Sequence, residues 1–170
     1  SQCIYLLYLQ GVNDVVTSRY PSNEKDVTVL AALQLQAEHG DYKDAIHFQG
    51  WLKPQITQYM PEKLLIKKKK INDKLVAEWE QKILEKYKRV TGFTSLEAQL
   101  NYLDYLQEWV YFGCCWFNVE QRQFKNYPTE LMLGINCEGV IIVHPQKRIV
   151  LENYEFTDIV TWGHSDEKFI

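Results

Sequence analysis

The segment LEAQLNYLDYLQEWVYFGCCWFNVEQ, residues 96–121, changes from one hydrophobic period to another. Its first part carries leucines three and four residues apart, which is the spacing of one helix face. Its second part, after Gly113, is a short aromatic-rich run typical of a strand. We therefore predict an α+β protein with a helical domain at 1–111 and a strand-bearing domain at 112–170.

Upstream of this segment, the sequence carries the start and stop signals of several helices. Asn23 or Ser22 is expected to cap a helix that Gly40 ends. Thr94 and Glu97 have the spacing of a capping box at the start of the last helix. The inward faces are predicted to carry Val27, Leu30, Leu33 and Ala37, then Trp79, Ile83, Tyr87 and Val90, and then Leu96, Leu100, Leu103 and Trp109 or Val110.

Downstream, short apolar or alternating runs are separated by turn residues. The predicted strands lie within 113–121, 129–145, 148–156 and 158–163. Their spacing indicates a meandering antiparallel sheet, in which Leu131, Leu133 and Ile135 share one face.

Composition excludes several classes of protein. The chain has 170 residues, of which 46% are hydrophobic, enough for a packed core. A net charge of −3 argues against a general nucleic-acid binder. The four cysteines form no C-x-x-C pair, so we predict a reducing, cytosolic location and buried free thiols. No apolar run approaches the length of about 18 residues that a transmembrane helix needs.

Signatures of catalysis are missing from the sequence. It contains neither a phosphate-binding P-loop nor a dinucleotide-binding glycine pattern. The four histidines are scattered, without the spacing of metal ligands. We therefore expect no catalytic residues, no cofactor and no metal site, and we interpret the tryptophans on helix faces as core residues.

Four consecutive lysines, Lys67 to Lys70, form the centre of a basic segment in an acidic chain. A solvated run of this kind needs no function. If the run were helical, Lys67 and Lys70 would share a face and could join Lys63 and Lys74 in one basic patch. Such a patch would suit acidic phospholipid or an acidic protein partner, whereas nucleic acid is disfavoured by the net charge.

The order of these segments resembles the FERM family. LKPQITQYMPEKLLIKKKK (52–70), followed by residues 96–121, resembles the second lobe of a FERM domain. YFGCCWFNVEQ (111–121) resembles the entry into the third lobe, and 130–163 resembles its first strands, including an L-G-I-x-x-x-G-V hairpin. YPSNEKDVTVLAALQLQAEHGDY (20–42) is most similar to the MyTH4-FERM tails of unconventional class VII-type myosins, with talin-type FERM domains next.

This resemblance implies a fold and a function. The fold is an acyl-CoA-binding-protein-like helical lobe followed by the first strands of a pleckstrin-homology-like β lobe. By this resemblance, we expect these residues to lack the ubiquitin-like first lobe and to stop within the third lobe near 168–170. Most of the peptide groove of that lobe would then be missing, with Trp162 at its expected edge.

The implied function is a non-catalytic interaction module of a cytoskeletal protein in the cytoplasm and at the cell cortex. In an actin-based unconventional myosin it would be the cargo-binding or autoinhibitory tail, whose partners are a cargo tail, a receptor tail or its own motor head. The alternatives are a talin-like adhesion adaptor that links receptors to actin, or the FERM module of a larger signalling enzyme.

Overall fold

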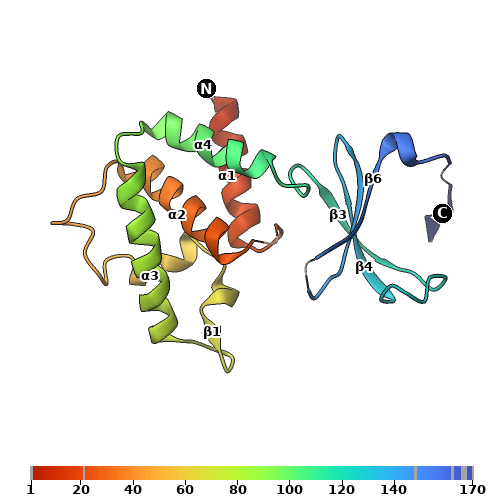
Figure 1. Ribbon diagram of the computed structural model, residues 1–170, viewed down its shortest axis with the longest axis horizontal. Coiled ribbons are helices and arrows are strands. Elements are labelled where there is room, and N and C mark those ends of the chain that lie inside the picture. The colour runs from red at the N-terminus through yellow and green to blue at the C-terminus, as the bar shows by residue number, and fades with distance from the viewer. Residues whose placement is uncertain (1, 21, 148, 162, 166–167, 170) are drawn as a thin grey trace. The chain divides into compact units, whose positions relative to one another are not determined.

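The computed structural model describes residues 2–20, 22–147, 149–161, 163–165 and 168–169. The chain divides into two compact units, 1–108 and 109–170. The first is helical and the second carries an antiparallel sheet (Figure 1). The predicted α+β class, a helical lobe followed by antiparallel strands, is confirmed.

The described residues of the first unit contain four α-helices. They are α1 (Gln2–Val16), α2 (Glu24–His39), α3 (Asp73–Tyr87) and α4 (Ser95–Gln107). In the same described part of the chain, three short 3-10 helices lie between the α-helices: η1 (Lys53–Gln58), η2 (Glu62–Leu64) and η3 (Lys88–Val90). A two-stranded hairpin, β1 (Ile66–Lys67) and β2 (Lys70–Ile71), leads into α3.

The predicted helix signals are present. Asn23 caps α2 by accepting from Asp26 N, and the Asp26 carboxylate accepts from Asn23 N in return, which completes a capping box. Gly40 ends this helix with a positive φ of 71°. Thr94 and Glu97 form the predicted capping box of α4. Local side-chain chemistry therefore sets three of the boundaries.

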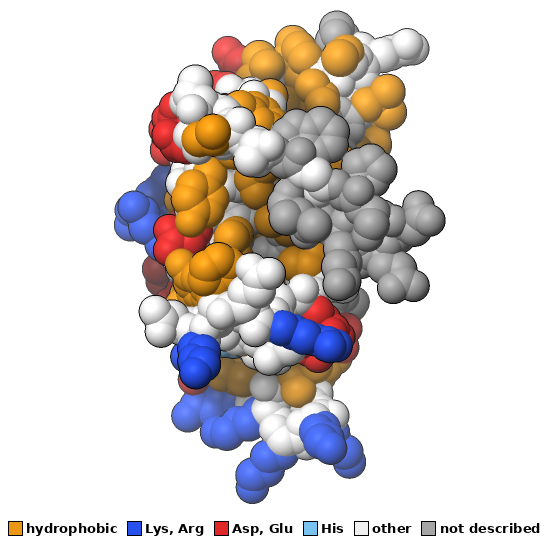
Figure 2. All heavy atoms as spheres, turned by 90° about the vertical axis from the view of Figure 1, so that its right-hand side faces the viewer, with side chains coloured by type: hydrophobic (Ala, Val, Ile, Leu, Met, Phe, Trp, Pro, Cys, Tyr) orange, Lys and Arg blue, Asp and Glu red, His pale blue; other side chains and the backbone are white. Residues whose placement is uncertain are grey.

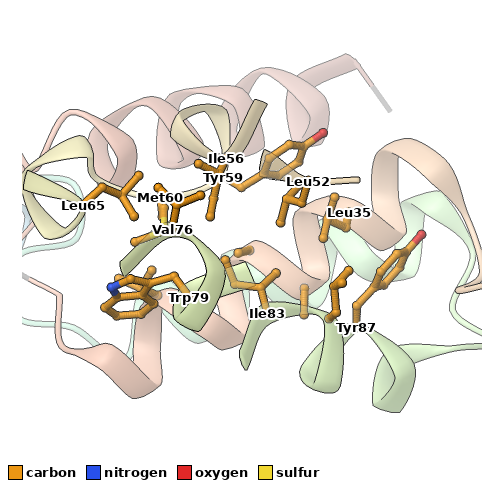
Figure 3. Close-up of a cluster of buried hydrophobic side chains, with 14 residues drawn as sticks. Leu35, Leu52, Ile56, Tyr59, Met60, Leu65, Val76, Trp79, Ile83 and Tyr87 are labelled. Carbon is orange, nitrogen blue, oxygen red and sulfur yellow. The ribbon is translucent and has the colours of Figure 1, made fainter. Parts of the chain in front are cut away.

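The core of the helical unit lies between α2, α3 and the segment from η1 to the hairpin (Figure 3). Leu35 from α2, Ile83 and Tyr87 from α3, and Leu52 and Met60 from the intervening segment are all fully buried. Trp79 is 9% exposed and packs in this cluster, as its helical spacing predicted. Burial of these side chains supplies the main stabilisation of the unit.

The predicted inward face of α4 is partly wrong. Leu96 and Leu100 are 45% and 37% exposed, whereas Ala98, Tyr102 and Leu106 are buried together with the predicted Leu103. The reason is a close approach of α1. A Cβ atom at Gly11 would lie 2.7 Å from Leu106 Cδ1 and 3.6 Å from Tyr102 Cε1. Because Gly11 has no side chain, α1 can pack closely against the face of α4 that carries Tyr102 and Leu106, and this face is buried.

Among its described residues, the second unit holds a meander of four antiparallel strands in the order β3-β4-β5-β6. They are β3 (Cys115–Glu120), β4 (Glu130–Ile135), β5 (Gly139–Val143) and β6 (Val150–Glu155). After them come the 3-10 helix η4 (Phe156–Asp158) and a hairpin of β7 (His164–Ser165) and β8 (Lys168–Phe169).

Alternation along β4 places Leu131, Leu133 and Ile135 on one face, as predicted. The buried cluster of this unit lies on the other face, where Met132, Ile141 and Val143 pack with Trp116. A Cβ atom at Gly134 would lie 2.8 Å from both Trp116 and Ile141, so glycine is needed for this packing. Hydrophobic side chains reach the surface over much of the view in Figure 2, and Phe117 is 50% exposed.

The predicted strand at 158–163 is wrong for its described part. Asp158 belongs to η4, and residues 159–161 form no strand. The Asp158 carboxylate accepts a hydrogen bond from Glu155 N at 3.1 Å, and Phe156 N donates to Glu138 O. These bonds turn the chain into a 3-10 helix at the end of β6.

Candidate functional site

The lysine run forms the tip of a β-hairpin. Ile66 pairs with Ile71, and Lys67 pairs with Lys70, so Lys68 and Lys69 are the two loop residues. The helical alternative considered for this run is therefore wrong, because the chain reverses within it. Lys67 and Lys70 nevertheless lie on the same face, as directly opposed residues of an antiparallel pair.

The backbone of this loop is unfavourable for lysine. Lys68 and Lys69 have φ values of 52° and 64°, in the left-handed region. Positive φ at both central residues defines the type I′ hairpin turn, for which Asn-Gly is the preferred sequence. A lysine in this region strains its Cβ against the following carbonyl. Like charges face each other at Lys67 and Lys70, which further disfavours the hairpin.

The base of the hairpin is firmly held. Leu65 is fully buried in the core, and its carbonyl accepts from Asn72 N at 2.9 Å. The side chain of Asn72 accepts from Leu75 N at 3.1 Å and so caps α3. The hairpin is thus fixed between the core and a helix start, and its strained tip lies in solvent (Figure 1).

Charge at the tip is uncompensated. All four lysines from Lys67 to Lys70 are exposed, and in the described part of the chain none of them forms an ion pair. Lys63 lies before the hairpin in η2, and Lys74 lies after it in the first turn of α3. The Lys74 ammonium is 3.9 Å from Glu78 Oε1. The tip lysines are therefore the free positive charges of the predicted patch.

Sequence reasoning missed the exposed apolar residues of this hairpin. Ile66 and Ile71, on either side of the lysines, are 42% and 52% exposed. An isoleucine on each side of the lysine run is visible in the sequence, but its pairing across two strands follows only once a hairpin is assigned. The other predicted site residue, Trp162, lies outside the described residues.

A buried carboxylate was also missed. Glu80 in α3 is 1% exposed and accepts hydrogen bonds from Leu52 N at 2.6 Å, Gly50 N at 2.8 Å and Lys53 N at 3.2 Å. It also accepts from Gln49 Nε2 at 3.0 Å. These donors hold the segment before η1 against α3, so the carboxylate is a structural group. No motif in the sequence distinguishes it from the exposed acids of the same helix.

The histidines and cysteines of the described residues show no metal-binding cluster. No group of three or more His, Cys, Asp or Glu among them could hold a metal ion. His47 is buried against the rings of Tyr42, Trp51 and Tyr87, and its Nδ1 accepts from Lys43 N at 2.9 Å. Burial lowers the pKa of His47. This histidine is a packed core residue.

The prediction of buried thiols is wrong. Cys3, Cys115 and Cys137 are exposed, and Cys114 is partly buried. All four are free. Burial raises the pKa of Cys114 to about 11, so this thiol is a poor nucleophile at neutral pH.

Comparison with known families identifies the helical unit. The model of the FERM central domain matches residues 1–117. The chain belongs to the FERM family. The model of the PTB domain (IRS-1 type) matches residues 117–170, in agreement with the β unit. None of the helices in the described ranges is long and apolar enough to cross a membrane.

Related proteins support the FERM resemblance inferred from the sequence. FERM domain-containing protein B from Dictyostelium discoideum is 30% identical over 99% of this chain, which spans 35% of that protein. Talin-A from the same organism is 25% identical over 98% of the chain, which spans 12% of it. The human Myosin 7b C-terminal MyTH4-FERM domain, solved in complex with the harmonin-a PDZ3 domain, has a TM-score of 0.72 and 25% identity, covering 93% of this chain and 31% of that one.

Proposed function

We propose that this FERM chain docks a cytoskeletal protein onto acidic phospholipid membranes through the lysine hairpin of residues 66–71. FERM domains of the related myosins, talins and merlin are protein and membrane interaction modules. The hairpin is the observation that carries the proposal, because it presents four lysines without ion pairs among the described residues, and two of them, Lys68 and Lys69, occupy an unfavourable turn. Unfavourable local structure that persists is a reason to look for a function.

The energetics suit a membrane surface. Each lysine near an anionic leaflet contributes about 1 kcal/mol of attraction, and this attraction decays within one Debye length. The four tip lysines lie within one six-residue hairpin, so they reach the same surface together. We therefore expect binding that is salt-sensitive and that requires acidic lipid. Lys63 and Lys74, in the flanking elements, would add to it at closer approach.

We further propose that the parent protein is an actin-based unconventional myosin, with this module in its cargo-binding or autoinhibitory tail at the cell cortex. The solved complex of the Myosin 7b MyTH4-FERM domain with a PDZ domain supports a role in binding protein partners. The similarity to Talin-A favours a second candidate, a talin-like adaptor between membrane receptors and actin. In either protein this chain has no catalytic role. The sequence of the parent transcript distinguishes a motor head from a talin rod.

Vesicle co-sedimentation tests the membrane proposal. The wild-type chain is expected to bind vesicles of phosphatidylserine and phosphatidylcholine at low ionic strength but not pure phosphatidylcholine. Charge reversal of the tip, with Lys67, Lys68, Lys69 and Lys70 each replaced by Glu, should abolish this binding.

A matched control separates the hairpin from net charge. It reverses four exposed basic residues elsewhere: Lys25, Lys43, Arg89 and Lys125. Both variants change the net charge by the same amount, so only a local role of the hairpin predicts a difference between them. Equal binding by the wild type and the tip variant at low ionic strength would show that the hairpin does not mediate membrane docking.

A further inference from the structure

The lysine hairpin also has an apolar side. Ile66 and Ile71 are directly paired across the two strands, and both are about half exposed. Side chains alternate between the faces of a strand, so the isoleucines point away from the face that carries Lys67 and Lys70. One face of the hairpin is therefore hydrophobic, the other is basic, and the turn adds two more lysines.

We propose that Ile66 and Ile71 form an apolar wedge that inserts into the interfacial layer of an acidic membrane while the hairpin lysines bind the lipid headgroups. This inference rests on the proposed membrane-docking function and deepens it. The base of the hairpin is fixed by Leu65 and Asn72, so the two isoleucines are already held in position before the membrane is bound.

The chemistry of the tip suits a lipid boundary. At the boundary between headgroups and acyl chains, apolar side chains can enter hydrocarbon while neighbouring ammonium groups stay among phosphates. Lysine has a long apolar stem that allows this arrangement. The basic and apolar groups lie within the same six residues of the hairpin, so both can reach a membrane boundary that is only a few ångströms deep.

A protein groove is a poorer match for the same surface. A specific protein interface buries about 800 Å² on each partner, contributed by about 20 residues or more. The hairpin offers six residues, four of which are lysines with large side-chain entropy. The observations therefore favour the membrane as the occupant.

Insertion of the isoleucines adds a hydrophobic contribution to the binding free energy, and salt does not screen this contribution. Electrostatic attraction between exposed charges is largely lost at about 1 M salt, where the Debye length is about 3 Å. Hydrophobic transfer of the isoleucines is unaffected by this screening. A wedge therefore predicts that the isoleucines strengthen wild-type binding to acidic vesicles by a similar factor at low and at raised salt.

The test replaces both isoleucines with threonine, which keeps the β-branched shape that favours a strand but removes the apolar character. The Ile66→Thr/Ile71→Thr variant should bind phosphatidylserine-containing vesicles about tenfold more weakly than the wild type. The same loss of affinity should persist as the salt concentration rises, and the variant should enter a phosphatidylserine monolayer only at lower surface pressure. The control is Ile46→Thr, since Ile46 is 48% exposed in a loop outside the hairpin. Circular dichroism checks that each variant is folded.

The outcomes separate the two proposals. Loss of binding in the lysine-to-glutamate variant, with wild-type affinity and insertion pressure in the double-threonine variant, would overturn the wedge and leave the docking proposal intact. Weakened binding in both variants supports the wedge. A wild-type chain that binds no acidic vesicle, or that binds equally without its lysines, overturns both proposals.

Discussion

Replacing the two turn lysines with the residues that the turn prefers should make the protein more stable and a weaker membrane binder. The change is Lys68→Asn together with Lys69→Gly. Lys68 and Lys69 have φ values of 52° and 64°, a conformation that costs a residue with a Cβ about 1 to 2 kcal/mol. Asparagine tolerates this region well, and glycine adopts it without strain.

The magnitude follows from these two positions. The stabilisation gained at position 69 is reduced by about 0.5 to 1 kcal/mol, because glycine has more conformational freedom in the unfolded chain. We therefore expect the free energy of unfolding of the helical unit to rise by about 1 to 2 kcal/mol. At about 4 °C per kcal/mol for a unit of this size, the Tm should increase by about 4 to 8 °C.

Urea denaturation followed by circular dichroism at a helix band measures this change. The control is Lys67→Gln with Lys70→Gln, which removes the same charge from the strand positions and leaves the turn backbone as it is. It should gain only a few tenths of a kcal/mol, from the lost repulsion across the hairpin. Vesicle affinity should fall in both variants. If the turn variant were no more stable than this control, the strain argument would be refuted.

Three further outcomes are expected. Glu80→Ala removes the acceptor of three backbone N–H groups and should lower the free energy of unfolding by about 3 kcal/mol, measured by urea denaturation with Glu85→Ala as an exposed control. Gly11→Val should cost about 1 to 3 kcal/mol by the same method, because its side chain would collide with Leu106; unchanged stability would contradict the close α1–α4 packing. Burial lowers the pKa of His47 in the folded state. The contribution of neutral His47 to the free energy of unfolding should therefore be fully present above about pH 6.5, and it should decline as the pH falls from there toward the folded pKa. His47→Gln should flatten this decline in Tm, and a decline of the same depth in the variant would assign it to other groups.

Much of the fold could be predicted, because local chemistry decides it. The capping boxes at Asn23 and Thr94 fix helix starts through bonds between residues three apart, and such bonds are readable from sequence. The meander follows from turn residues between apolar runs. The buried face of α4 could not be predicted, since it depends on Gly11, more than ninety residues away along the chain.

The candidate site was predicted only in part. The run of lysines was evident, but a lysine pair is not a recognised turn signal, so the hairpin and its strain depend on the tertiary anchors at Leu65 and Asn72. The exposed isoleucines followed from that hairpin. Glu80 was unpredictable for a similar reason, because its hydrogen-bond donors lie about thirty residues upstream.

Amide hydrogen exchange on the full chain, with and without nanodiscs that contain phosphatidylserine, tests whether the lysine hairpin docks on acidic membranes. We predict that acidic nanodiscs slow exchange in the peptide covering residues 66–71, and that phosphatidylcholine nanodiscs do not. Protection by acidic nanodiscs that appears elsewhere and leaves the hairpin unchanged would contradict it.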